Sequence, residues 1–167
     1  MPEALRGAVF VHGAGAGGWE WTAWARVFAA ADIAVAAPDL RAAPAGLAAT
    51  TLADYSAQVA QWLEAVPRPR LLAGASLGGL LAAVNAGAAE VLVLVNALPP
   101  RGLPDAPRRP AVVPWGRNAS LAGTRRALPG ADDATALFAF RRWRDESGAV
   151  LNQAEAGLAL PRPAMPV

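Results

Sequence analysis

Short apolar runs alternate with helix-length segments along the first 98 residues of the chain. The runs are Gly7–His12, Ile33–Ala37, Arg70–Ala73 and Val91–Val95. This alternation is typical of a parallel sheet with helices on both faces. The uninterrupted VLVLV sequence of the last run further indicates a strand buried on both faces. We therefore predict an α/β fold built on four parallel strands.

Three helices are expected between these strands, over about residues 19–31, 51–65 and 77–88. The second has the clearest start signal, because Thr51 and Asp54 have the Ser/Thr-x-x-acid spacing that satisfies free backbone N–H groups at a helix start. Pro67 and Pro69 follow its end. The sequence therefore specifies the helical elements of the core as well as its strands.

The alternating pattern stops at Pro99, because six prolines occur between Pro99 and Pro114. Beyond them we expect a helix from Asp132 or Asp133 to residues 143–144 and a shorter one over Val150–Ala156. A chain of 167 residues has the length of one globular unit. We divide it into a core (1–98), a helical cap region (99–160) and a linker to a further core strand (161–167).

Composition excludes several kinds of site. The chain has no cysteine and one histidine, so disulfides, thiolate catalysis and zinc sites with several Cys or His ligands are excluded. No cofactor is expected. Arginines exceed acidic residues by only two, which gives no reason to expect a nucleic-acid partner. The arginine pairs at 108–109, 125–126 and 141–142, and Asp105, are expected on a solvated cap surface.

Neither the N-terminus nor the longest uncharged stretch predicts a membrane protein. Residues 1–6 lack a basic region followed by an apolar one, so they do not resemble a signal peptide, and a cytoplasmic location is expected. Leu71–Ala89 carries no charge and has the length of a membrane span. Glycines and Ser76 interrupt it, however, which favours a strand, a turn and a helix.

That turn carries the strongest chemical motif in the sequence. Gly74-Ala75-Ser76-Leu77-Gly78 matches G-x-S-x-G between a predicted strand and a predicted helix. In this context the turn exposes the serine hydroxyl, and the N–H of Leu77 faces a developing oxyanion. Ser76 is therefore a candidate nucleophile. The alternative is that the glycines merely permit a tight connection.

A second glycine-rich turn, at residues 12–18, is open to two interpretations. Gly13, Gly15 and Gly18 satisfy G-x-G-x-x-G after a strand, and Asp39 lies about twenty residues further on, as in dinucleotide-binding Rossmann proteins that take NAD. However, Trp19 crowds the helix start where a pyrophosphate needs room. This interpretation also leaves the motif around Ser76 unexplained, so we favour the alternative below.

Several motifs together resemble the α/β-hydrolase fold family, in the branch that includes plant methylesterases and hydroxynitrile lyases. In chain order they are His12-Gly13-Ala14, Gly18-Trp19, Pro38-Asp39-Leu40, Thr51-Leu52-Ala53-Asp54-Tyr55 and Gly74-Ala75-Ser76-Leu77-Gly78-Gly79. The resemblance covers residues 5–98. It implies that Ser76 is the nucleophile, that the N–H groups of Leu77 and Ala14 bind the oxyanion, and that the strands ending at His12 and Ser76 are neighbours.

One departure from the family pattern limits the expected activity. The triad of this fold runs Ser, then Asp or Glu, then His along the chain, and no histidine follows Ser76. In the family, a histidine at the place of His12 supports the oxyanion loop, and a role as the base is the less favoured interpretation. We expect a truncated or degenerate carboxylester hydrolase, weak or inactive. The alternatives are a split hydrolase completed by a second polypeptide and, third, the dinucleotide-binding protein.

The expected partners follow from this interpretation. The substrate would be a small ester-like molecule. In the family's strand order Val91–Val95 is interior, so one of its edges is expected to be bare here. We therefore expect a homodimer, or pairing with a complementing chain, through this edge, and no membrane or nucleic-acid partner.

Overall fold

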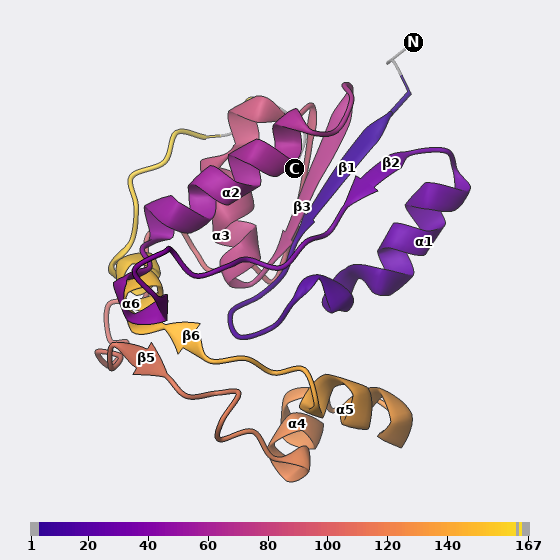
Figure 1. Cartoon of the computed structure of the whole chain (residues 1–167). Helices are drawn as coiled ribbons and strands as arrows, with labels where there is room; N and C mark the ends of the chain where they lie inside the picture. Colours follow the sequence, from indigo (N-terminus) through magenta and orange to yellow (C-terminus); the bar gives the residue numbers. More distant parts are fainter. Residues whose placement is uncertain (1–3, 163, 165–167) are drawn as a thin grey trace.

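The computed structural model describes residues 4–162 and 164 of the chain, which form a parallel sheet with helices on both faces (Figure 1). The sheet has the order β2-β1-β3-β4, and all of its neighbours are parallel. Its strands are β1 (Gly7–Val11), β2 (Ala34–Ala36), β3 (Arg70–Ala75) and β4 (Val91–Val95). The predicted α/β architecture, a parallel sheet with helices on both faces, is confirmed.

The two faces of the sheet have separate apolar clusters, because successive strand residues point to opposite sides. Val9, Val11 and Leu72 pack with α2 (Leu52–Glu64) and α3 (Leu77–Val84). On the other face, Ala8 and Phe10 pack with residues of α1 (Thr22–Ala30) and of the short 3-10 helix η1 (Gly18–Trp21) before it. The alternation along β1 thus explains the three-layer arrangement.

Most helix boundaries agree with the sequence pattern. The Thr51–Asp54 capping box is present at the start of α2. The helix expected over 77–88 is divided into α3 and a 3-10 turn, η3 (Ala86–Ala88). The uncharged stretch Leu71–Ala89 therefore contains a strand, a turn and a helix. None of the helices in the described part of the chain has the length and apolar character needed to cross a membrane.

One expectation about β4 was wrong. Its apolar sequence indicated burial on both faces, but only Leu92 is buried, and Leu94 and Val95 are 37% and 40% exposed. The reason is its place in the sheet. β4 lies at the edge, with β3 on one side and no further strand among the described residues on the other.

Residues 99–160, hereafter the outer segment, form short elements beside the core (Figure 1). The predicted helices are present as α5, which ends at Phe140 rather than at 143–144, and α6, whose Val150 joins the core cluster. The sequence pattern missed α4 and a two-stranded antiparallel sheet. The elements are β5 (Val112–Val113), α4 (Leu121–Ala127), α5 (Asp133–Phe140), β6 (Glu146–Ser147) and α6 (Gly148–Ala156). Most of the linker expected at 161–167 lies outside the described residues.

Candidate active site

Ser76 lies at the sharp turn between β3 and α3, with backbone angles φ 51° and ψ −116°. A residue other than glycine rarely adopts a positive φ, so the surrounding structure must hold Ser76 in this conformation. The Ser76 N–H donates to the carbonyl of Val95 at 3.1 Å, and the Ser76 carbonyl accepts from the N–H of Leu98 at 3.0 Å. The serine side chain makes no capping hydrogen bond to α3. The residue is half-buried.

The two flanking glycines let the helix lie directly on the strands. A Cβ added at Gly74 would collide with the carbonyl of Gly78, and one added at Gly78 would collide with the carbonyls of Val11 and His12. Both collisions are with backbone atoms, which cannot turn away as a side chain can. The glycines of the G-x-S-x-G motif are thus required by close packing of α3 on β1 and β3.

The loop after β1 lies beside this turn. β1 and β3 are neighbours with Val11 opposite Gly74, as the resemblance implied, so their carboxyl ends meet at one edge of the sheet. A Cβ built at Gly13 would lie 3.5 Å from the Cβ of Ser76. Ala14 follows it and is half-buried, and Leu77 is the first residue of α3. The candidate nucleophile and both candidate oxyanion residues therefore come from adjoining loops.

Three glycines of the 12–18 turn have backbone N–H groups that donate to carboxylates of this chain. The pairs are Gly13 with Glu20 at 2.8 Å, Gly15 with Glu146 at 2.9 Å, and Gly18 with Asp39 at 2.8 Å. In the dinucleotide-binding interpretation such N–H groups bind a pyrophosphate. Here they are occupied by negative groups, which argues strongly against that interpretation and against NAD as a ligand.

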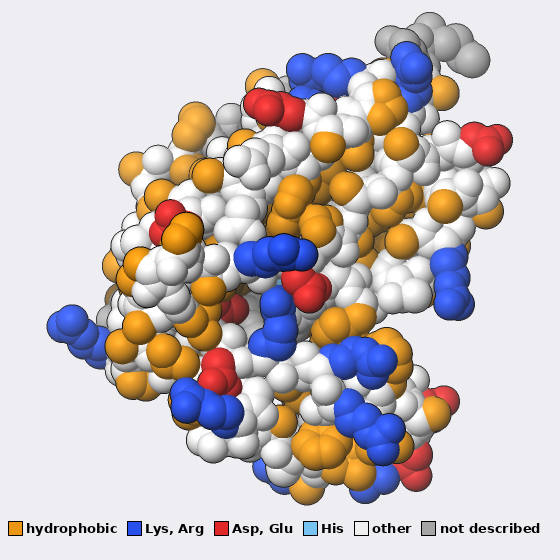
Figure 2. Space-filling model, in the orientation of Figure 1, with side chains coloured by type: hydrophobic (Ala, Val, Ile, Leu, Met, Phe, Trp, Pro, Cys, Tyr) orange, Lys and Arg blue, Asp and Glu red, His pale blue; other side chains and the backbone are white. Residues whose placement is uncertain are grey.

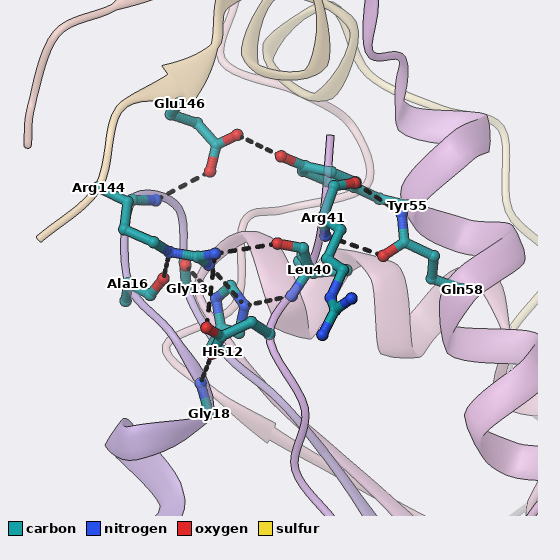
Figure 3. Close-up of polar contacts among 12 residues, drawn as sticks. His12, Gly13, Ala16, Gly18, Leu40, Arg41, Tyr55, Gln58, Arg144 and Glu146 are labelled. Atoms are coloured by element: carbon teal, nitrogen blue, oxygen red, sulfur yellow. Dashed lines mark hydrogen bonds and ion pairs between the residues drawn. The ribbon is translucent and has the colours of Figure 1, made fainter. Parts of the chain in front are cut away.

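His12 is fully buried and holds the loop in place (Figure 3). Its Nδ1 lies 2.8 Å from the carbonyl of Gly13, and its Nε2 accepts the N–H of Leu40 at 2.8 Å. Burial lowers the pKa of the imidazole to about 4, against the raising effect of the Gly13 carbonyl. His12 is thus neutral near pH 7, with both nitrogens bound to partners other than Ser76. This geometry favours the supporting role over that of a base.

Arg144 of the outer segment joins the same cluster, although no sequence motif pointed to it (Figure 3). Its guanidinium donates to the carbonyls of Ala16 at 2.7 Å and Leu40 at 3.1 Å, and lies 3.2 Å from Nε2 of His12. Its backbone N–H donates to the carbonyl of Gly15 at 2.7 Å. The outer segment is thereby fastened to the glycine-rich loop.

Glu146 makes a second, buried connection between the outer segment and the core. It is 3% exposed, and its carboxylate accepts the N–H of Gly15 and the hydroxyl of Tyr55, the latter at 2.8 Å. Burial, reinforced by the neighbouring carboxylate, raises the pKa of the Tyr55 phenol far above its usual range. Tyr55 is therefore a permanent hydrogen-bond donor. The two residues are 91 positions apart, and no sequence signal pointed to this pair.

An apolar pocket of about 590 Å³ opens next to the Ser76 turn. Its wall includes Ala75, which precedes Ser76, and Val95, whose carbonyl accepts the Ser76 N–H, and Glu20 is its acidic residue. Figure 2 shows a hollow between the region of α1 and the helices α4 and α5. The pocket's aromatic lining consists of Trp19, Trp21, Trp24, Phe138 and Trp143. In the described part of the chain, no group of three or more Asp, Glu or His residues could hold a metal ion.

The comparisons with known proteins agree with this geometry. A sequence profile described as "Alpha/beta hydrolase family" matches residues 8–167. The chain belongs to the alpha/beta hydrolase family. A comparison with curated proteins gave no match.

Several solved structures have a similar fold at low sequence identity. A methylesterase from Arabidopsis is 16% identical with a TM-score of 0.70, over 94% of this chain and 73% of that one. Tomato methylketone synthase I with 2-tridecanone bound is 17% identical with a TM-score of 0.71, over 95% of this chain and 74% of that one. A pyrethroid hydrolase from Sphingobium faniae is 18% identical with a TM-score of 0.63, over 95% of this chain and 76% of that one.

Proposed function

We propose that this alpha/beta hydrolase chain is a serine hydrolase of carboxylic esters, with Ser76 as its nucleophile. The observation that carries the proposal is the backbone of Ser76, which is held at a positive φ between β3 and α3, at the carboxyl end of the strand. A turn of this kind presents a hydroxyl to a substrate above the sheet. The methylesterase and the pyrethroid hydrolase among the similar structures support ester chemistry.

In the proposed reaction, the Ser76 oxygen attacks the ester carbonyl, and the N–H groups of Leu77 and Ala14 stabilise the negative charge on the carbonyl oxygen. The aromatic pocket beside Ala75 and Val95 would hold an apolar group of the ester. We therefore expect a preference for esters with an aromatic or branched apolar part. No cofactor takes part.

We expect this chain by itself to react slowly, because its single histidine is bound to the loop and this sequence holds no other base of that kind. Loss of the triad histidine leaves roughly 10³–10⁴-fold acceleration over water in serine hydrolases. A second polypeptide that brings an acid and a histidine to the exposed edge of β4 would raise the rate. This split arrangement is our second candidate function.

The test is labelling of the pure chain with a fluorophosphonate probe, which reacts with activated serines. We expect slow labelling that is lost in Ser76→Ala, because the probe needs a nucleophilic hydroxyl. Mass spectrometry locates the label and p-nitrophenyl butyrate reports turnover. Equal labelling of the wild type and Ser76→Ala would contradict the proposal. Labelling as fast as in an ordinary esterase would instead show that an efficient proton acceptor is present.

We also propose that two copies of the chain pair through β4, because it is the last strand of the described sheet and its Leu94 and Val95 are exposed. Light scattering at tens of micromolar should give the mass of a dimer. Val95→Lys places a charge on this edge and should yield monomers. Val27→Lys, which changes a 68% exposed valine on α1, is the matched control and should remain dimeric. A monomeric wild type would refute the pairing.

A further inference from the structure

We propose that Glu20 is the proton acceptor for Ser76, so that the catalytic pair of this chain is a serine and a glutamate. The inference rests on the proposed function, because it assigns a base to the same nucleophile. Neither the motifs nor the resemblance pointed to Glu20. Its position in the structure does.

The first observation is geometric. Glu20 belongs to η1, and its Oε2 accepts the N–H of Gly13 at 2.8 Å. A Cβ built at Gly13 would lie 3.5 Å from the Cβ of Ser76 and 3.7 Å from Oε2 of Glu20. The carboxylate and the serine therefore flank the same side of the loop. A general base acts directly or through one water molecule, and Glu20 would reach the Ser76 hydroxyl by a turn of its side chain or through one bridging water.

The second observation concerns the surroundings of the carboxylate. Glu20 is exposed as a residue, but it lines the aromatic pocket, and burial of its carboxyl raises the pKa of that group against the opposing effect of the Gly13 N–H. A raised pKa makes a carboxylate a stronger base. Arg26 on α1 is the other charged residue of the pocket. The lining residues from β3, β4 and the outer segment are uncharged.

The other candidates near the loop have different tasks. Both nitrogens of His12 are occupied, and Glu146 is buried against Tyr55 and Gly15. Asp39 accepts the N–H of Gly18 and lies 3.7 Å from Arg144. Of these four groups, Glu20 is the one that lines the pocket and also lies, like Ser76, within 4 Å of a Cβ built at Gly13.

The proton balance of the reaction is complete with this pair. As the Ser76 oxygen bonds to the ester carbonyl carbon, its hydrogen passes to the Glu20 carboxylate. The protonated Glu20 then gives this proton to the departing alkoxide. The alkoxide leaves as an alcohol, and Ser76 remains as an acyl-serine. In the second half, Glu20 takes a proton from water as the water oxygen attacks the acyl carbon. It returns the proton to Ser76 when the carboxylic acid leaves.

Glu20→Gln is the decisive variant. The glutamine amide oxygen can still accept the Gly13 N–H, but it cannot take up a proton. We expect the Ser76-dependent kcat for p-nitrophenyl butyrate to fall by about 100-fold or more, with little change in KM. In the wild type, kcat should rise with pH through one ionisation above the ordinary range of a glutamate. This dependence should vanish in Glu20→Gln, and Glu20→Asp should restore part of the rate.

Three controls separate the possible outcomes. Ser76→Ala defines the Ser76-dependent rate, and wild-type activity in that variant would overturn the proposed function itself. An inactive Ser76→Ala together with a fully active Glu20→Gln would overturn only the role of Glu20. Asp105→Asn removes an exposed acid on the outer segment and should leave kcat and its pH profile unchanged. An equal loss in this control would count against a specific base, and thermal unfolding verifies that all variants are folded.

Discussion

Gly78→Ala is expected to destabilise the folded chain by about 3 kcal/mol or more and to remove the reactivity of Ser76. The new methyl group would meet the carbonyl oxygens of Val11 and His12, which belong to the central strand and its loop. Relief requires α3 to move away from β1. Because Ser76 immediately precedes α3, the same movement would change its backbone angles. Urea unfolding followed by circular dichroism measures the first effect, and fluorophosphonate labelling the second.

Gly87→Ala is the matched control for this substitution. Gly87 lies in η3, only nine positions further on, and a Cβ built there meets nothing within 4 Å. The change should be neutral or slightly stabilising, since alanine reduces the freedom of the unfolded chain. If both variants unfolded at the wild-type urea concentration, the close packing of α3 on β1 would be disproved.

The stability of the chain is expected to fall by about 3 kcal/mol between pH 6.5 and pH 4 through His12 alone. The folded protein holds the pKa of this imidazole at about 4, whereas in the unfolded chain it has the ordinary value of 6.5. Between these values the unfolded state binds the proton and the folded state does not. The contribution is therefore complete above pH 6.5 and is lost as the pH falls through 4. Urea unfolding from pH 4 to 7.5 measures it.

The single histidine also allows a direct measurement. The Hε1 resonance of His12 is unambiguous in an NMR titration, and it should shift near pH 4 in the folded protein and near 6.5 in urea. Glu20 works in the opposite sense, because its raised pKa stabilises the folded state at low pH and that contribution is lost as the pH rises. Comparison of the unfolding data with His12→Gln isolates the histidine. A folded-state titration near 6.5 would refute the account of His12.

Local patterns predicted the core of the fold well, because each of its elements is encoded by nearby residues. The capping box at Thr51 and Asp54, the strand at Val91–Val95 and the turn at Ser76 are all found in the structure. The neighbourhood of β1 and β3 came from the resemblance rather than from any local pattern. It is confirmed by their register.

The remaining features depend on contacts between distant residues. Whether an apolar strand is central or at an edge is decided by the rest of the sheet. The VLVLV pattern alone therefore predicted burial on both faces, and only the family's strand order indicated the bare edge beside which Leu94 and Val95 are exposed. No sequence pattern distinguished Arg144 from the other arginines of the chain, which has fifteen in all, and only the folded structure brings it close to His12. No motif in the sequence singled out Glu20. Its value as a base depends on Gly13 and Ser76, which are adjacent to it only in the fold.

The shape of the glycine-rich loop is fixed by acids from three separate places in the chain, one of them in β6. This arrangement has a practical consequence for protein engineering. A chimaera that replaces the outer segment with that of a relative would lose Arg144 and Glu146, and with them the hydrogen bonds that fix Gly15. A graft that preserves the geometry above the serine must transplant these two residues together with their strand. New substrate specificity is therefore better sought in α4 and α5, which lie outside this junction.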